Sequence, residues 1–293
     1  MQAYDVAEFS HVTLGRKLGS GTYGSVFIGL LPSGRFVAVK QIDLQSDDSE
    51  PINREVEVHK QLLHPNIVRY LHSRTEQSVS STSSQQTTVI IPRLNLYLEL
   101  VTGGSVNSLM KTLPGGKLPV WPARVYSRHM FLGLLYLHDH GIAHRDVKGD
   151  NLLISLDTGT AKLADFDQAK VFQQTMRSQG AAAGTLAGTP FWMAPEVVTE
   201  EKYNPFKADV WSGGCTVAEM LTGKAPWIPT QQPMGVVVKL ASTQGWPDAV
   251  PRDPLLLGGC AEAVDFLDKC FTRDPTQRPD CRTLLSHPFL QWS

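Results

Sequence analysis

The strongest constraint on this chain is a polar segment near its centre that is followed by a second acidic motif. Residues 144–151 read H-R-D-V-K-G-D-N, and D-F-D at residues 165–167 begins fourteen residues after Asn151. Phosphoryl transfer needs a carboxylate beside the attacking hydroxyl, and an amide and a second carboxylate that hold metal ions. Asp146, Asn151 and Asp165 supply these groups in that order. The alternative is an ordinary polar loop between a helix and a hairpin, and the register of Lys148 with these residues argues against it.

A glycine-rich segment between two predicted strands is the second constraint. Paired strands are expected over residues 14–42, and residues 18–26 between them read L-G-S-G-T-Y-G-S-V. A dinucleotide-binding turn would open a helix, with an acid about 20 residues further on, whereas V-F-I at 26–28 continues as a strand. A Walker loop is excluded because no Gly-Lys-Ser/Thr follows. The pattern therefore predicts a hairpin whose backbone approaches a phosphate, with Val26 and Ala38 as an apolar roof over adenine; ordinary strand core is compatible with this role.

Lys40 ends a short strand of small apolar residues, V-A-V-K at 37–40. A partly desolvated lysine needs a partner, and Glu55 is the expected one, on a helix that Ser49 caps. Glu57 is the competing acid, but it points away from the predicted buried side of that helix. This buried side is expected to carry Ile52, Val56, Leu62 and Leu63.

Composition changes between residues 75 and 88, which are rich in Ser, Thr and Gln. Such a segment cannot bury a core, so we expect a mobile loop that could carry phosphorylation sites.

A strand is expected over 94–101, a hinge over 102–105 and a long helix over 122–140 with Gly141 as its left-handed cap. Residues 152–154 and 161–163 bracket D-T-G and predict a hairpin.

The segment 168–188 is polar and lacks periodicity, which predicts a mobile loop that phosphorylation could order. It closes with G-T-P-F-W-M-A-P-E at 188–196. Helices are expected from Asp209 through Met220 and over 263–271, with a break at 274–279. We find no internal repeat and no second domain.

Composition places the chain in a broad class. Its 293 residues carry a net charge of −1, so neither nucleic acid nor an anionic membrane is expected as a partner. No pair of the four cysteines has CxxC spacing, which favours free thiols in a reducing compartment. The first residues lack a basic or apolar leader, and no apolar run approaches the roughly 20 residues that span a bilayer. We therefore expect a cytoplasmic protein without a membrane span.

From about residue 9 to 289, this ordered series of motifs resembles the eukaryotic-type protein kinases. Within them it is similar to the sterile-type group that activates MAP kinase kinases, on the motifs at 188–196, 207–217 and 285–289. The motif H-R-D-V-K-G-D-N instead resembles that of the neighbouring branch, whose members act one tier higher in the kinase cascade. The resemblance implies an α+β bilobal fold, a single kinase domain over 1–293 with a small β-rich N-lobe at about 9–101, a hinge at 102–105 and a mainly helical C-lobe at 106–293.

The resemblance also implies roles for individual residues. Asp146 would accept the substrate proton, Lys148 would contact the γ-phosphate, and Asn151 and Asp165 would ligate Mg²⁺. Lys40 would hold the α- and β-phosphates of ATP and pair with Glu55. The backbone of Glu99 and Val101 would hydrogen-bond adenine, with Leu98 as gatekeeper. The remaining nucleotide-contacting positions would be Leu18, Gly19, Ser20, Gly21, Thr22, Tyr23, Gly24, Ser25, Val26 and Ala38.

Partners and regulation follow from the same resemblance. Lys148 implies serine or threonine acceptors, and the expected substrate is a protein, possibly a MAP kinase kinase. Activation by an upstream kinase or by autophosphorylation is expected at Thr185, whose phosphate would meet Arg145 and Lys170. Thr175 and Ser178 are weaker candidates, and Thr189 is expected to contact the acceptor site. Glu196 and Arg278 should form a buried structural pair, and Asp209 should cap the backbone of the 144–151 segment.

Two residues depart from the family pattern. Asp167 replaces the glycine of D-F-G, and His59 stands where an apolar side chain is usual. We expect a buried neutral histidine with a structural role rather than a pH switch. Asp167 is expected to bias Phe166 toward its inward position; the alternative is that Asp167 simply faces solvent. Asp167 also keeps a second functional class open, a pseudokinase that acts as a scaffold or an allosteric binding module.

Overall fold

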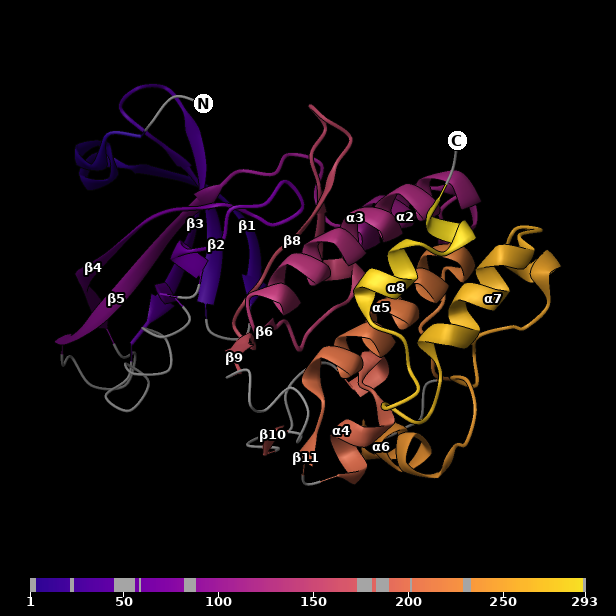
Figure 1. Cartoon of the computed structure of the whole chain (residues 1–293). Helices are drawn as coiled ribbons and strands as arrows, with labels where there is room; N and C mark the ends of the chain where they lie inside the picture. The colour runs from indigo at the N-terminus through magenta and orange to yellow at the C-terminus, as the bar shows by residue number, and fades with distance from the viewer. Residues whose placement is uncertain are drawn as a thin grey trace. The chain divides into compact units, whose positions relative to one another are not determined.

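The computed structural model describes residues 4–21, 24–44, 56–57, 59–81, 88–172, 181–182, 190–200, 202–228 and 233–291. The chain divides into two compact units, residues 1–101 and 102–293 (Figure 1). The division falls at the start of the segment expected to be a hinge. Thr22, Tyr23, Ser49, Ile52, Glu55, Thr175, Ser178, Thr185 and Thr189 lie outside the described residues.

The first unit is built on an antiparallel sheet in the order β1-β2-β3-β5-β4. Its strands are β1 (Thr13–Gly21), β2 (Gly24–Leu30), β3 (Phe36–Asp43), β4 (Tyr70–Ser81) and β5 (Thr88–Glu99), and a short 3₁₀ helix, η1 (Val6–His11), precedes them. Because side chains alternate across a strand, Val37 and Val39 pack with Phe9 and Tyr97 on one side. Ile42 packs with Val56, Leu94 and Leu96 in a separate cluster. The predicted paired strands are confirmed.

Gly24 has a structural reason to be glycine that the sequence pattern did not reveal. A Cβ at this position would collide with the carbonyl oxygen of Gln41 in β3. Gly19, in contrast, has nothing within 4 Å of its ideal Cβ position. Close pairing of β2 with β3 therefore requires Gly24, whereas no such steric requirement applies at Gly19, whose predicted phosphate contact stays a prediction.

The expected mobile loop at 75–88 is wrong for most of its length. β4 and β5 pair without interruption from Ser73↔Leu96 to Ser81↔Thr88. Exposed strands tolerate Ser, Thr and Gln, because main-chain hydrogen bonds to a neighbouring strand do not require apolar side chains. Polar composition alone therefore did not distinguish a solvated ribbon from a loop.

The helix predicted to carry Glu55 needs a second correction, at its end. Val56 and Leu62 are buried, but Leu63 is 67% exposed. The helical residues described here end at Lys60, and Leu62 N–H already closes a turn on the carbonyl of His59. The apolar periodicity of the helix therefore does not extend to Leu63.

The second unit is mainly helical. Its helices are α2 (Val106–Thr112), α3 (Val120–Asp139), α4 (Pro195–Thr199), α5 (Pro205–Thr222), α6 (Pro233–Ser242), α7 (Ala261–Cys270) and α8 (Cys281–Leu285). The short strands pair as β6 (Ile142–Ala143) with β9 (Lys170–Val171), β7 (Leu152–Ile154) with β8 (Ala161–Leu163), and β10 (Ala181–Ala182) with β11 (Lys202–Tyr203). Its short 3₁₀ segments are η2 (Pro114–Gly116), η3 (Gly149–Asn151), η5 (Pro190–Trp192), η6 (Pro254–Leu257) and η7 (Pro288–Leu290).

The predicted helices and hairpin of this unit are confirmed, with shifted boundaries. α3 starts two residues earlier than expected and is followed by Gly141 at φ 74°. α5 starts at Pro205 because the side chain of Asn204 accepts hydrogen bonds from the first backbone N–H groups of the helix. The expectation of an irregular segment at 168–188 is wrong at residues 170–171, which pair with β6, and at residues 181–182, which pair with β11. Among the described residues, no helix is both long and apolar enough to cross a bilayer.

Candidate active site

Asp209, near the start of α5, holds the backbone of the segment 144–151. Its Oδ2 accepts the N–H of His144 at 2.8 Å, and its Oδ1 accepts the N–H of Arg145 at 2.8 Å. The side chain of Asp209 is buried, and His138 Nε2 lies 2.9 Å from Oδ2. Arg145 takes φ 67° at this point. The carboxylate therefore stabilises a left-handed turn that a non-glycine residue otherwise avoids, and the predicted capping role of Asp209 is confirmed.

The ring of His144 connects this segment to the D-F-D motif. Its Nδ1 accepts the N–H of Asp146 at 3.3 Å, and its Nε2 donates to the carbonyl of Ala164 at 3.1 Å. These two bonds place the ring hydrogen on Nε2. Phe166 is buried, and its ring centroid lies 5.2 Å from that of His144. A single buried ring thus joins residues 144–151, which we call the base segment after the predicted role of Asp146, to Phe166.

Asp146, Lys148 and Asn151 come together as the sequence predicts. Lys148 Nζ lies 2.7 Å from Asp146 Oδ2, and Asn151 Nδ2 lies 2.9 Å from the same oxygen. Asn151 Nδ2 also donates to the carbonyl of Asp146 at 2.8 Å. The amide orientation of Asn151 follows from these bonds, since only its nitrogen can donate. An ammonium and an amide therefore hold the Asp146 carboxylate in one position.

Asp165 takes φ 64°, and Asp167 is not among the described residues with positive φ. The positive φ in this motif therefore lies at Asp165, the predicted metal ligand, and not at Asp167. Sparsely populated backbone conformations persist where the surrounding structure determines them, commonly at functional sites. Asp167 is half-buried rather than fully solvated. Phe166, between them, is buried as expected for the inward position.

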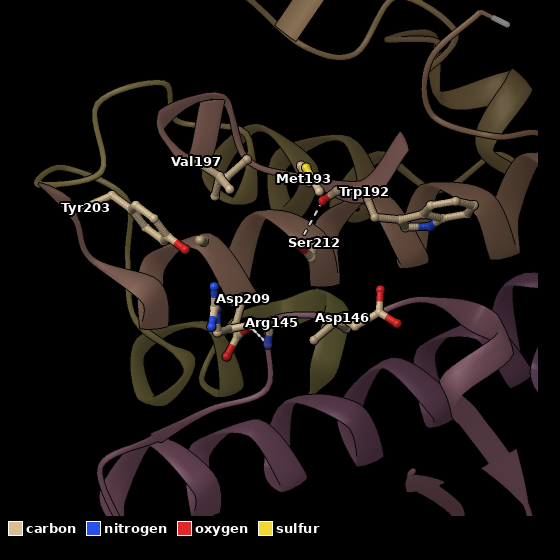
Figure 2. A pocket seen from close by; sticks show the side chains of 11 residues that line it. Arg145, Asp146, Trp192, Met193, Val197, Tyr203, Asp209 and Ser212 are labelled. Carbon is tan, nitrogen blue, oxygen red and sulfur yellow. Dashed lines mark hydrogen bonds between the residues drawn. The ribbon is translucent and has the colours of Figure 1, made fainter. Parts of the chain in front are cut away.

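A hollow adjoins residues 145–147 (Figure 2). The residues that line it are Arg145, Asp146, Val147, Trp192, Met193, Ala194, Val197, Tyr203, Ala208, Asp209 and Ser212. Figure 2 shows Arg145 and Asp146 on one side and Met193 and Val197 on the other. Ser212 Oγ donates to the carbonyl of Trp192 at 2.7 Å, which holds the far wall to α5. The hollow therefore places an apolar wall beside the candidate base.

Comparison with known proteins agrees with this geometry. A family model described as a protein kinase domain matches residues 12–290. The chain belongs to the protein kinase family. The predicted family and the α+β fold are thus confirmed.

Several curated relatives are named as mitogen-activated protein kinase kinase kinases, and another is named for cytokinesis. Mitogen-activated protein kinase kinase kinase 2 of Arabidopsis thaliana is 38% identical over 286 residues, which is 94% of this chain and 40% of that protein. Mitogen-activated protein kinase kinase kinase A of Dictyostelium discoideum is 36% identical over 94% of this chain and 27% of its own length. Cytokinesis protein sepH of Emericella nidulans is 38% identical over 98% of this chain. The chain spans less than half the length of these relatives.

The residues predicted to contact the nucleotide from β2, β3 and β5 lie in the first unit. In the strand register, Val26 opposes Lys40, and Lys40 opposes Leu96. Ala38 opposes Leu98 on the same face, because alternate residues of β3 share a face. Lys40 is 6% exposed. The predicted apolar roof, gatekeeper and phosphate-binding lysine therefore share one face of the sheet.

Glu99 is held by a contact that the sequence did not reveal. Its Oε1 accepts the N–H of Arg69 at 2.8 Å, and its own N–H donates to the carbonyl of Arg69 at 2.9 Å. These bonds order the chain just before Val101. The pairing of Lys40 with Glu55 stays a prediction, because Glu55 lies outside the described residues.

His59 is buried at 6% exposure, and its Nε2 donates to the carbonyl of Val68 at 2.8 Å. Burial lowers the pKa of His59 to about 4; the bond to Val68 opposes this effect and the charge of Lys40 adds to it. The histidine is therefore neutral at neutral pH. The expectation of a buried neutral histidine with a structural role is confirmed.

The predicted pair of Glu196 and Arg278 is also confirmed. Arg278 Nη1 lies 2.7 Å from Glu196 Oε1, Nη2 lies 3.1 Å from Oε2, and both side chains are buried. Nε and Nη1 of Arg278 also donate to the carbonyls of Thr272 and Lys207. These bonds satisfy both charges in place of water. The pair thus ties α4 to the loop before α8.

Sequence reasoning missed a polar cluster behind the base segment. Asn107 of α2 donates to Asp150 Oδ2 at 2.9 Å and to Glu219 Oε1 at 3.3 Å, and Trp192 Nε1 donates to Glu219 Oε2 at 3.2 Å. Burial raises the pKa of Glu219 to about 7, and the charge of Asp150 adds to this effect. The available signal was a glutamate inside the apolar stretch of α5, since a buried charge requires partners.

Proposed function

We propose that the domain transfers the γ-phosphate of ATP to serine or threonine hydroxyls of proteins. The observation that carries this proposal is the Asp146 carboxylate, which Lys148 and Asn151 hold from two sides at 2.7 and 2.9 Å. A positioned carboxylate is the group that accepts the hydroxyl proton in this reaction. A lysine beside it would share its charge with the incoming phosphate. The roles of these residues rest on the motif match together with this geometry.

Asn151 and Asp165 suit Mg²⁺ by the chemistry of their donors. Hard divalent cations prefer carboxylate and amide oxygens, and Mg²⁺ is commonly held by one or two protein ligands together with substrate phosphates. The bonds from Asn151 Nδ2 to Asp146 turn the amide oxygen of Asn151 the other way. When bound, the ion would neutralise charge on the phosphates. Asn151 and Asp165 would hold it.

ATP contacts are proposed for the first unit. Lys40 would bind the α- and β-phosphates, the glycine-rich hairpin would cover them, and the backbone of Glu99 and Val101 would bind adenine. The shared face of Val26, Ala38 and Lys40 supports this assignment. Little covalent work is left to the protein in such a reaction, so rate depends on position and charge.

We further propose that the domain acts as a MAP kinase kinase kinase, with a MAP kinase kinase as its protein substrate. The names of the Arabidopsis and Dictyostelium relatives support this tier. The sepH relative shows that similar domains also occur in proteins named for another process. Cytoplasmic location and activation by phosphorylation at Thr185 belong to the same proposal.

The test is a phosphotransfer assay with a set of candidate protein substrates. The wild-type domain is incubated with ATP, Mg²⁺ and catalytically inactive MAP kinase kinases, and the products are identified by intact mass and by phosphosite mapping. The proposal predicts phosphoserine or phosphothreonine on at least one of them, and loss of this product in Lys40→Met. Phosphate on protein substrates of another kind alone would reject the tier and keep the activity. No transfer with any substrate, including the domain itself, would reject the activity and favour a pseudokinase.

A further inference from the structure

We propose that the outer edge of β4 is a self-association surface, at which β4 pairs antiparallel with β4 of a second copy of this chain. β4 is the last strand in the order β1-β2-β3-β5-β4 (Figure 1). In the part of the chain that the structure describes, β4 pairs with β5 alone. Residues 74–77 are exposed. An exposed edge strand is a template for another strand, and this inference does not depend on the catalytic proposal.

The orientation of Pro92 in β5 shows which backbone N–H and C=O groups of β4 point away from β5. Pro92 has no N–H, and its carbonyl accepts the N–H of Leu44 at 2.8 Å, on the side away from β4. Gln77 lies opposite Pro92. In an antiparallel ladder such a residue pair is not hydrogen-bonded, so the N–H and C=O of Gln77 point away from β5. By alternation, the same groups of Thr75 and Ser73 also point outward.

The sequence of this edge is complementary to itself. A two-fold axis at Thr75 places Thr75 opposite Thr75 of the second copy and Ser73 opposite Gln77 of the second copy. All of these residues present outward backbone groups, so they form the hydrogen-bonded pairs of the new ladder. Arg74 then faces Glu76 of the second copy in a non-hydrogen-bonded pair, where side chains approach most closely. Opposite charges at such a position stabilise a sheet.

The two charges select this register. Moving the axis to Arg74 or to Glu76 would place like charges opposite each other, which destabilises a strand pair. Within one chain, Arg74 Nε lies 3.5 Å from Glu76 Oε1, and the side chains are 41% and 43% exposed. Such a loose surface pair contributes little to folding. Both side chains can therefore exchange partners when a second strand arrives.

This edge lacks some of the features that prevent strand addition, and its two charges, Arg74 and Glu76, disfavour only a partner strand that is not complementary. Natural edges carry lysine, proline or a bulge, and residues 73–77 contain neither lysine nor proline. The irregularity in β4 lies earlier, between Tyr70 and His72. The contact is small, so we expect a weak dimer with a Kd in the micromolar range, roughly 1–100 µM. Because exposed charges contribute, dimerisation should weaken as salt concentration rises.

The test exchanges the two charges by mutation and measures self-association by sedimentation velocity. The full chain is studied at concentrations of roughly 1–200 µM, which bracket the expected Kd. Wild type should show a monomer–dimer equilibrium. Arg74→Glu and Glu76→Arg should each raise Kd at least tenfold, because each places like charges opposite in a homodimer. An equimolar mixture of the two variants, with one fluorescently labelled, should recover a heterodimer with wild-type affinity. Arg282→Glu, at an exposed pair in the second unit, is the matched control and should leave Kd unchanged.

A second variant tests the backbone separately. Thr75→Pro removes an N–H that points away from β5, so the native sheet should keep its hydrogen bonds while the dimer is lost. Wild type that stays monomeric throughout the range, or single charge variants that dimerise like wild type, would overturn the proposal. A mixture that fails to recover association would also overturn it. Binding of an extended peptide from another protein to a monomeric wild type would assign the edge to a different occupant and overturn the second-copy inference.

Discussion

At the scale of single residues, His59 makes a specific prediction for stability against pH. Its pKa is about 4 in the folded chain against 6.5 as the ordinary value. The unfolded chain therefore binds more protons between these pH values, and the free energy of unfolding falls as pH falls through this window. The full loss is about 3 kcal/mol. In urea denaturation, the free energy of unfolding should therefore fall less for His59→Leu than for wild type when the pH is lowered from 7.5 to 4, and the difference should be about 3 kcal/mol.

Two comparisons isolate the contribution of His59. Glu219 acts with the opposite sign, since a carboxyl whose pKa is raised to about 7 stabilises the folded chain at lower pH. It is present in both proteins, so the difference between wild type and variant is unaffected. His11→Leu, at an exposed position of the first unit, is the control and should keep the wild-type pH dependence. Equal pH dependence in wild type and His59→Leu would show that the histidine is not held neutral by burial.

Asp167 makes a second prediction at this scale. In the described state it has no positive φ, so its Cβ adds no left-handed backbone penalty while Phe166 is buried against His144. A residue with a Cβ restricts the dihedral changes that release of the phenylalanine requires. Asp167→Gly should therefore gain up to about tenfold affinity for inhibitors that need Phe166 outward, which equals about 1.4 kcal/mol. Activity should be retained; restored activity from an inactive wild type would instead support the pseudokinase alternative.

At the scale of elements, the Glu196–Arg278 pair joins α4 to the loop before α8. Arg278→Lys keeps the charge but cannot make both bonds to the carboxylate. Breaking a buried pair costs about 3–5 kcal/mol, so we expect a loss near the lower end of this range in chemical denaturation. Arg282→Lys is the control, because Arg282 bonds both oxygens of Asp139 at an exposed site. Exposed pairs contribute about 0–1 kcal/mol, and an equal loss in both variants would contradict the structural role.

Local patterns predicted much of these elements. The short apolar strand at 37–40, the D-T-G turn and the cap at Gly141 depend on a few neighbouring residues, and each is found where it was expected. The ribbon of β4 and β5 was missed because partner pairing, rather than composition, makes residues 75–81 a strand. The cluster of Asn107, Asp150 and Glu219 was missed because its members are far apart in sequence. Contacts of this kind depend on tertiary packing, which no local pattern encodes.

At the scale of the whole molecule, we expect phosphorylation of the segment before A-P-E to activate the domain through contacts with the base segment. Thr185 lies outside the described residues, whereas Arg145 lines the hollow beside Asp146 and Lys170 pairs with Ala143 in the β6–β9 ladder. A phosphate on Thr185 would bring about −1.5 to −2 charges to these two cations. Thr185→Ala should lower kcat/KM sharply, and Arg145→Ala should add little to it. Full activity in Thr185→Ala, or additive losses in the double variant, would reject this link; Thr158→Ala, in the β7–β8 turn, is the control.

The most direct test of the central claim is kcat of Asp146→Asn, measured with the wild-type substrate at saturating ATP and Mg²⁺. The asparagine has a similar shape but cannot accept the proton, and general-base catalysis contributes about 10²–10⁴-fold. We predict a fall in kcat of at least about 10²-fold with ATP affinity unchanged. Asp157→Asn, the same change at an exposed turn position, should keep wild-type kcat. An Asp146→Asn variant that retains more than about a tenth of wild-type kcat would contradict the assignment of Asp146 as the base.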